Sequence, residues 1–535
     1  MYKRARVITF GDWRGVNNTQ DPALIRDNEL QSCVNFYVSN TGRLVARPGF
    51  IKLFDTPAEV VEIAKFQSDF YVACKDGKVY KWNGSSLSEI GEHESGDVYF
   101  QVALGKLWIA DGGKLKYWDG SAFGTIDDFL YHDELVGTGD GATKSYSYST
   151  SEVPVSSNSV KVKYTIQGTQ YEATDDGQGG ISGTSLSGTV AYDTGAVNLT
   201  FDTAPDNGTE IRIIYSCSDV LDVKADFIEF RQERIWLAKG DSLYYSEIRD
   251  PSRWGFIKVA SKDESDISAI AQLYDKLIVF KEGKDRGIYA LSGNSEETFV
   301  VGLIAKGVSA KNREIVSALG DLYFLDGSQL YSLKTIVEYG DIKPIQINQK
   351  FLIEDNDYVL IPIPIANVIF GFAGYSGFTF TPTRRAFTSL AFHEKITSAL
   401  VVENEVYLGG ENAVFKFADV NTDNGKDIYY KLSTKVINAG GFRRVLLKRF
   451  SLYGAGIDDA EILLSVFKRS TGYNLATLSL PKIARYGFAV WDSDKWSNPS
   501  AFFKPLRQLI GGDYIYFIII SKDRFVLDSF SLEVS

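Results

Sequence analysis

The sequence predicts an all-β protein built around a β-propeller of about seven blades. Its 535 residues include 30 Tyr, 34 Phe and 48 Gly but a single Met, a composition that favours aromatic-rich strands joined by many turns. A phrase also occurs twice near the start, as YVACKDGKVYKW at 71–82 and LWIADGGKLKYW at 107–118. Each copy is an apolar run, a Gly-bearing turn and an alternating run, which is the pattern of a β-hairpin.

The phrase recurs along the chain at intervals typical of a four-stranded propeller blade. Copies begin near residues 70, 106, 234, 276, 321, 367 and 405. Successive spacings are 36, 128, 42, 45, 46 and 38 residues, and all but 128 fall in the range of one blade. The long spacing would contain one blade and an inserted domain. We therefore expect two blades in 51–132 and the remaining blades in 219–420.

The predicted insertion covers residues 133–218. Its composition shifts to Gly, Ser, Thr and Asp, and segments such as SVKVKYTI and EIRIIYS alternate apolar with polar residues. This alternation is typical of half-buried strands. A small β-sandwich is the predicted fold of the insertion.

The two ends of the chain lack the repeated phrase. Residues 1–50 are rich in turn formers and predict an extended arm on the surface of another molecule, with a short helix near 23–28. The segment NTDNGK at 421–426 predicts a linker. Long alternating strands in 427–535 predict a separate β-sandwich-like domain.

Composition and motifs argue against several classes of function. The net charge of −11 disfavours wrapping of nucleic acid on a basic surface, and no apolar run is long enough for a transmembrane helix. The three cysteines are far apart and predict reduced thiols. GTGDGATK at 137–144 lacks the Gly-Lys order of a phosphate loop. DVNTDNGKD at 419–427 lacks the Gly and Glu of a calcium loop.

These patterns predict a protein that is not an enzyme, with no catalytic residue, cofactor or metal site. The three histidines lack the helical spacing of a zinc hydrolase and are interpreted as solvated loop residues. One basic cluster is a candidate contact with DNA or with a partner protein. The alternative is a solvated or salt-bridged strand. The cluster consists of Arg443, Arg444, Lys448 and Arg449.

The amino-terminal arm carries an ordered set of residues, namely Gly15, Asn17, Asp21, Pro22, Asn35, Gly42, Leu44, Arg47, Pro48 and Gly49. The set resembles the start of short-tailed phage tail proteins, namely the tail nozzle (tail tubular protein B) and the packaged-DNA stabilisation proteins of the tail hub. SLYYSEIRDPSRWG at 242–255 and KLIVFKEGKDRGIYALSG at 276–293 resemble the blades of that group. The resemblance implies an assembly or structural role for the arm residues Gly15, Asn17, Asp21, Pro22, Asn35, Gly42, Leu44, Arg47, Pro48 and Gly49.

The resemblance implies a virion structural protein that acts mechanically. It implies a homo-oligomeric ring, a hexamer, mounted below the portal and adaptor (head-to-tail connector) proteins and in contact with tail fibres or spikes. Double-stranded DNA would pass through the lumen without sequence specificity, be retained before ejection and be conducted during it. An acidic lining would let the phosphates slide, and the arm would order on a neighbour. The expected location is the phage tail, assembled in the host cytoplasm.

Two alternatives stay open from the sequence. One is a tail-tip propeller that binds or cleaves host surface glycan, which would need aromatic residues and converging carboxylates around a pocket. The other is a propeller scaffold unconnected with virions. The inserted domain is a departure from the family pattern, so its orientation and role are not predicted.

Overall fold

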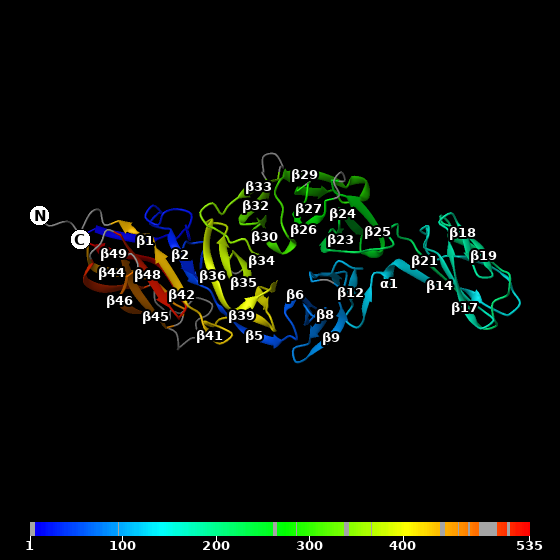
Figure 1. Ribbon diagram of the computed structural model, residues 1–535, viewed down its shortest axis with the longest axis horizontal. Coiled ribbons are helices and arrows are strands. Elements are labelled where there is room, and N and C mark those ends of the chain that lie inside the picture. The colour runs from blue at the N-terminus through cyan, green and yellow to red at the C-terminus, as the bar shows by residue number, and fades with distance from the viewer. Residues whose placement is uncertain are drawn as a thin grey trace.

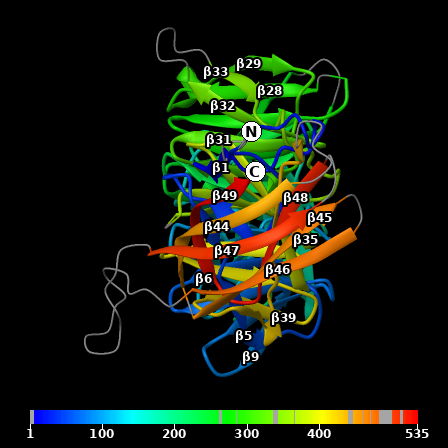
Figure 2. The same cartoon turned by 90° about the vertical axis from the view of Figure 1, so that its left-hand side faces the viewer.

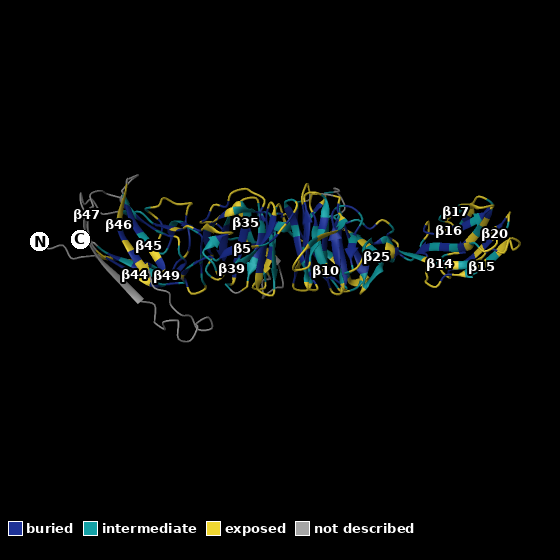
Figure 3. Cartoon of the chain, turned by 90° about the horizontal axis from the view of Figure 1, so that it is seen from below, coloured by how far each residue is buried: buried dark blue, intermediate teal, exposed yellow. Residues whose placement is uncertain are grey.

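The computed structural model describes residues 6–534 except 95, 261–264, 285, 336–341, 365, 439–444, 458, 469–470, 481–499 and 511–513. Three β units follow one another along the long axis (Figure 1). A β-sandwich with both chain ends stands on the left, the propeller is central and the insertion is on the right. Figure 3 shows that buried residues follow the strands of each unit, while exposed residues gather at the turns.

Five blades of the propeller are contiguous four-stranded antiparallel sheets. Blade 1 contains β6 (Val60–Phe66), β7 (Asp69–Cys74), β8 (Lys78–Trp82) and β9 (Leu87–Glu92). Blade 2 contains β10 (Tyr99–Ala103), β11 (Lys106–Ala110), β12 (Lys116–Trp118) and β13 (Phe123–Thr125). Blade 3 contains β22 (Phe227–Arg231), β23 (Arg234–Lys239), β24 (Ser242–Glu247) and β25 (Asp250–Lys258). Blade 4 contains β26 (Ile267–Leu273), β27 (Lys276–Lys281), β28 (Gly287–Ser292) and β29 (Val300–Lys306). Blade 5 contains β30 (Ile315–Ala318), β31 (Asp321–Asp326), β32 (Gln329–Thr335) and β33 (Ile342–Gln346).

The last two blades each take a strand from the amino-terminal segment. Blade 6 contains β34 (Val359–Ile363), β35 (Val368–Thr381), β36 (Ala386–Ile396) and the outer strand β2 (Leu30–Val34), which is parallel to β36. Blade 7 contains β37 (Ser398–Val402), β38 (Glu405–Gly409), β39 (Ala413–Ala418) and the antiparallel outer strand β5 (Gly49–Asp55). The innermost strands contact one another in the order β6, β10, β22, β26, β30, β34, β37, and β37 returns to β6. The predicted seven-bladed propeller is therefore confirmed.

The repeated phrase covers the second and third strands of six blades. The exception is the copy at 367–380, which lies within the single long strand β35 of blade 6, so the hairpin expected there is not formed by these residues. In blade 1, for example, the second strand β7 has the burial of a continuous apolar core element. Apolar clusters then join neighbouring blades. Trp236 of blade 3 packs in one cluster with Leu277 and Tyr289 of blade 4, so the ring is held by contacts between blades as well as within them.

The insertion is one antiparallel sheet of eight strands that follows the short helix α1 (Asp127–Leu130). Its strands lie in the order β14, β21, β16, β17, β18, β19, β20, β15, and the two ends of the sheet approach each other. The sequence predicted the strands but not this curled single sheet, because alternation shows which side chains face a core and not whether the sheet closes. The bounds are β14 (Tyr131–Thr138), β15 (Ser145–Ser149), β16 (Lys161–Ile166), β17 (Thr169–Asp175), β18 (Gly180–Gly183), β19 (Leu186–Ala191), β20 (Ala196–Phe201) and β21 (Glu210–Ser216).

The carboxy-terminal domain is a two-layered sandwich whose strands lie across the end of the propeller (Figure 2). One layer contains β1 (Arg6–Gly11), β3 (Phe36–Val38), β4 (Leu44–Ala46), β44 (Val445–Gly456), β47 (Ser500–Ile510) and β49 (Phe525–Val534). The other contains β42 (Tyr430–Thr434), β43 (Ile437–Asn438), β45 (Ala460–Lys468), β46 (Thr471–Leu480) and β48 (Tyr514–Ser521), and β2 joins it to blade 6.

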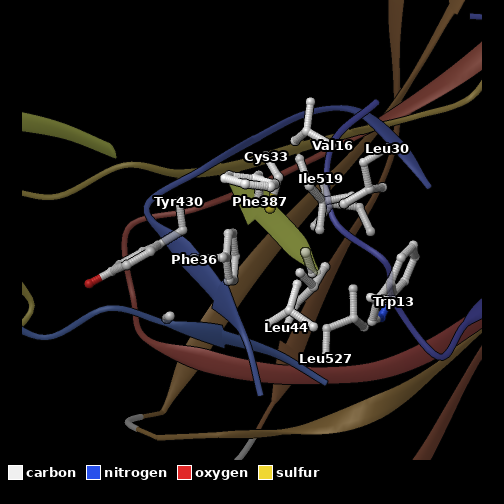
Figure 4. Close-up of a cluster of buried hydrophobic side chains, with 14 of the residues drawn as sticks. Trp13, Val16, Leu30, Cys33, Phe36, Leu44, Phe387, Tyr430, Ile519 and Leu527 are labelled. Atoms are coloured by element: carbon white, nitrogen blue, oxygen red, sulfur yellow. The ribbon is translucent and has the colours of Figure 1, made fainter. Parts of the chain in front are cut away.

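The prediction of an extended arm on another molecule is wrong for the described part of 1–50. Strands β1 and β4 pair with β49, β2 pairs with β42 and β36, and β5 closes the propeller. Figure 4 shows arm side chains, including Trp13 and Leu30, in one core with Phe387 of blade 6 and Leu527 of β49. Residues 23–28 form turns and not the expected helix. The partners of these short strands lie hundreds of residues away, so no local pattern shows them.

Candidate functional site at the arm junction

Three of the arm residues singled out by sequence, Arg47, Asn35 and Gly49, meet at a buried ion pair. Arg47 lies between β4 and β5, and its side chain is fully buried together with that of Asp423. Arg47 Nη1 donates to Asp423 Oδ1 at 2.8 Å, and Arg47 Nη2 donates to Asp423 Oδ2 at 2.7 Å. This two-point geometry matches the planar guanidinium to the carboxylate. It ties the arm to the segment that leaves blade 7.

The Arg47 guanidinium also donates hydrogen bonds to three groups besides Asp423. Nε donates to Asn35 Oδ1 at 3.0 Å, Nη2 donates to the Ala391 carbonyl at 2.8 Å, and Nη1 donates to the Pro48 carbonyl at 3.1 Å. The guanidinium carbon lies 4.6 Å from the centre of the Phe392 ring. A buried charge is tolerated when it is paired and hydrogen-bonded throughout, and Arg47 meets both conditions.

Asn35 connects three parts of the chain at the same junction. Besides accepting from Arg47, its Oδ1 accepts from the Ala391 N–H at 3.0 Å, and its Nδ2 donates to the Tyr429 carbonyl at 2.9 Å. Its backbone φ is +66°, a conformation that Asn adopts more readily than most residues. Asn35 thereby joins the arm, blade 6 and the carboxy-terminal domain.

The segment predicted to be a linker at 421–426 belongs to this junction, so that prediction is corrected. It contains β40 (Thr422–Asp423) and the start of β41 (Lys426–Asp427), and β40 lies beside β5. Gly49 sits against it, because a Cβ at this position would lie 2.0 Å from the Thr422 carbonyl oxygen. Sequence reasoning missed Asp423 since its polar neighbours suggested solvent. The sequence signal for this pair was the Arg47-Pro48-Gly49 motif, because an arginine needs a carboxylate partner when its side chain is buried.

The remaining arm residues also lie at internal contacts. Gly15 has φ +80°, and a Cβ there would lie 2.4 Å from the Phe387 carbonyl oxygen. Asn17 is buried and its Nδ2 donates to Glu29 Oε2 at 2.9 Å. Burial opposes ionisation of Glu29, but hydrogen bonds from Lys350, Asn17 and the Arg26 N–H outweigh it and lower its pKa. The structure thus does not bring all motif residues to one point, but spreads them along the arm.

Four further motif residues fix the turns and strand ends of the arm. Asp21 Oδ1 accepts from the Ala23 N–H at 2.8 Å, and the Pro22 carbonyl accepts from the Val436 N–H at 2.9 Å. Gly42 has φ +81° and lies against the Asp12–Arg384 ion pair. Leu44 is fully buried in the sandwich core.

The basic cluster predicted to contact DNA or a partner is only partly described. Arg443 and Arg444 lie outside the described residues. Lys448 lies in β44, and Arg449 is exposed in the same strand, opposite Glu533 of β49. A role in DNA or partner contact stays a prediction.

The propeller axis contains a second group of ionisable residues. Glu62 of β6 lies 3.5 Å from Arg313, whose guanidinium carbon is 5.4 Å from the centre of the Tyr99 ring. Burial raises the pKa of Glu62 to about 7, although the charge of Arg313 opposes the rise. Glu229 of β22 has its pKa raised to about 7 by burial, and sequence reasoning missed it. The sequence signal for Glu229 was a single charged residue within the otherwise apolar run FIEF of an innermost strand.

The histidines and cysteines occupy separate places. His93 is buried, with Nε2 2.8 Å from the Cys74 carbonyl oxygen, so its interpretation as a solvated residue is wrong. The His132 ring stacks on Tyr215 at 5.1 Å, and His393 Nε2 lies 2.9 Å from the Asp427 carbonyl oxygen. Cys33 and Cys74 are buried free thiols and Cys217 is a half-buried one.

Two kinds of feature are absent from the described residues. No group of three or more His, Cys, Asp or Glu side chains in this part of the chain is arranged to hold a metal ion. None of the helices described is long and apolar enough to cross a membrane.

Comparison with known proteins gives structural similarity at low identity. No family model and no curated protein matches the chain. Among solved structures, the computationally designed Ika8 protein is 12% identical, with a TM-score of 0.34, covering 69% of this chain and 99% of its own. BamB from Moraxella catarrhalis is 12% identical, with a TM-score of 0.35 and coverages of 70% and 96%. An exo-beta-1,3-galactanase from Phanerochaete chrysosporium is 9% identical, with a TM-score of 0.24 and coverages of 58% and 96%.

Proposed function

We propose that this protein is a structural component of a tailed-phage virion, the ring-forming nozzle or hub that continues the DNA channel below the portal and adaptor. The observation that carries the proposal is the arm junction. The residues that resemble the family motif are those that set the path of the arm, with Arg47, Asn35 and Gly49 at the node between arm, propeller and sandwich. A motif that specifies the architecture of the subunit is expected at such a node, where three parts of the chain meet.

The shape of the subunit supports a mechanical role. The sandwich, propeller and insertion lie in line (Figure 1), and the sandwich shares one apolar core with blades 5 and 6. A rigid, elongated subunit can stand beside copies of itself around an axis, as closed rings require. The described arm residues pack inside their own subunit. The expectation that the arm orders on a neighbouring subunit is therefore wrong for these residues.

The charge of the chain fits passage of DNA. The net charge is −11, and a lumen lined by part of this acidic excess would repel phosphates and let a duplex slide. The ring would retain the genome until ejection, in contact with connector proteins and with fibres or spikes. A hexamer, a place in the phage tail and the absence of enzymatic activity belong to the same proposal.

Fractionation of the producing culture tests this proposal. On a density gradient we expect the chain to sediment with DNA-filled particles, and gold-labelled antibody against it to mark their tails. Recovery of the chain only among free proteins, with unlabelled particles, would contradict the proposal. Release of glycan fragments from host envelope by the purified chain would instead favour the tail-tip alternative.

A further inference from the structure

A cavity opens between blades 4 and 5, on the side of the propeller axis. Its volume is about 520 Å³, within the range of small-molecule sites. Its lining comes from the innermost strands β22, β26 and β30 and from the turns that follow β26 and β30. Polar lining residues include Glu229 of β22, Gln272 at the end of β26, Ser317 of β30, and Asn312, Tyr274 and Asp321 beside them.

Glu229 differs from Asp321 and Glu62 in the contacts of its carboxylate. Among the described residues, no lysine, arginine or histidine forms an ion pair with Glu229, which receives a hydrogen bond from the Phe230 N–H. In the same cavity Asp321 pairs with Lys334 at 2.8 Å. On the same propeller axis Glu62 pairs with Arg313. Glu229 is half-buried, and a partly desolvated carboxylate without a cation is an unfavourable arrangement that a bound cation relieves.

Two side-chain donors of the cavity, those of Gln272 and Ser317, are already used within the protein. Gln272 Nε2 donates to the Tyr274 carbonyl at 3.0 Å, and Ser317 Oγ donates to the Gln272 carbonyl at 3.3 Å. The side chain of Tyr274 is 57% exposed at the mouth, where the face of its ring can attract a cation. The lining therefore suits a ligand that donates hydrogen bonds and carries positive charge.

We propose that this cavity binds a primary ammonium group carried on a flexible aliphatic chain, with the ammonium beside Glu229 and the chain along Ser317 and the Tyr274 ring. Two sources have this chemistry, a free small diamine and a lysine side chain. The site is independent of ring formation, so its failure and that of the virion proposal are distinguishable.

Calorimetric titration of the full chain tests the site with three probes: 1,4-diaminobutane, its neutral analogue 1,4-butanediol, and lysine capped at both backbone ends. We expect the diamine or the capped lysine to bind and the diol not to bind. The amine that binds more tightly identifies the source. If neither amine binds at millimolar concentration, or if the diol binds equally, the proposal is overturned.

Two variants and a matched control locate the binding. Glu229→Gln should weaken amine binding about tenfold or more, because a charge-assisted hydrogen bond is lost. Glu62→Gln removes a similarly buried acid that already has Arg313 as partner, and should leave binding within about twofold. Ser317→Leu changes an exposed lining residue and should weaken binding by filling the cavity. Unchanged affinity in both Glu229→Gln and Ser317→Leu would overturn the assignment.

Discussion

The Arg47 guanidinium and the Asp423 carboxylate form their contacts where neither side chain is exposed to water. At the scale of single residues, the loss of one member of this pair costs more stability than the intact pair contributes. The pair as a whole contributes little net stability, since its attraction offsets the cost of desolvating two charges. Loss of one partner is different, because it leaves the other charge buried and uncompensated. The junction is therefore sensitive to single substitutions.

Arg47→Met is expected to lower the free energy of unfolding by about 3–5 kcal/mol, because Asp423 loses its counterion. Denaturant unfolding followed by tryptophan fluorescence measures the loss. Lys52→Met is the matched control, since Lys52 pairs with Asp55 at the surface and should cost at most about 1 kcal/mol. Equal effects of the two substitutions would contradict the role of the junction.

Glu229 makes stability depend on pH. Its pKa is raised by burial from 4.5 to about 7 in the folded chain, so between these values the folded state binds more protons than the unfolded state. Stability therefore falls as pH rises through this window, and the cost of ionising Glu229 stays constant above it. Glu229→Gln removes that cost.

The variant Glu229→Gln should be more stable than the wild type at pH 8, by up to about 3 kcal/mol, with a much smaller difference at pH 4. Chemical denaturation of both proteins across this range, in buffers without amines, checks the sign. A difference that is largest at pH 4 would contradict the assignment.

At the scale of elements, the amino-terminal strands complete domains formed by the other end of the chain. Phe10 of β1 stacks on Phe530 of β49, with ring centres 4.7 Å apart, and is fully buried. Phe10→Ala should destabilise the sandwich by about 3–5 kcal/mol. Val7→Ala is the control, because Val7 is 62% exposed in the same strand. Hydrogen exchange should show faster opening of β49 in Phe10→Ala alone. Unaltered exchange of β49 would indicate that β1 is dispensable.

The insertion is expected to fold without the propeller. Its core is composed of its own strands, and its entry and exit strands are paired at Tyr131 and Ser216. Replacement of 132–215 by a short Gly-Ser linker should leave the melting temperature of the remaining chain within a few degrees. Circular dichroism and calorimetry of the shortened chain and of isolated 131–217 check this. Loss of cooperative unfolding in either piece would contradict it.

How much the sequence predicts depends on how local the signal is. The hairpin phrase predicts the hairpins of six blades, because an apolar run, a turn and an alternating run are adjacent in the chain, whereas the copy in blade 6 forms the single strand β35. The closure of blade 7 by β5 and the sandwich strands of the arm depend on partners hundreds of residues away. The same holds for the site. Arg47 stands in a visible motif, but Asp423 is 376 positions distant in a segment whose composition suggests a linker.

At the scale of the whole molecule, three β units form one elongated chain (Figure 1). The shared core between sandwich and blades 5 and 6 keeps these two units in fixed positions. The insertion hangs from two paired strands at the opposite end. We propose that copies meet around an axis through the sides of the propeller.

The most direct test of the proposed ring is the mass and the image of the purified chain, alone and mixed with the connector protein that the proposed function calls for. Light scattering and single-particle electron microscopy measure both. We expect a closed ring of about six copies of the 59.5 kDa chain, with a lumen wide enough for duplex DNA. A chain that stays monomeric at every concentration and beside the connector would contradict it.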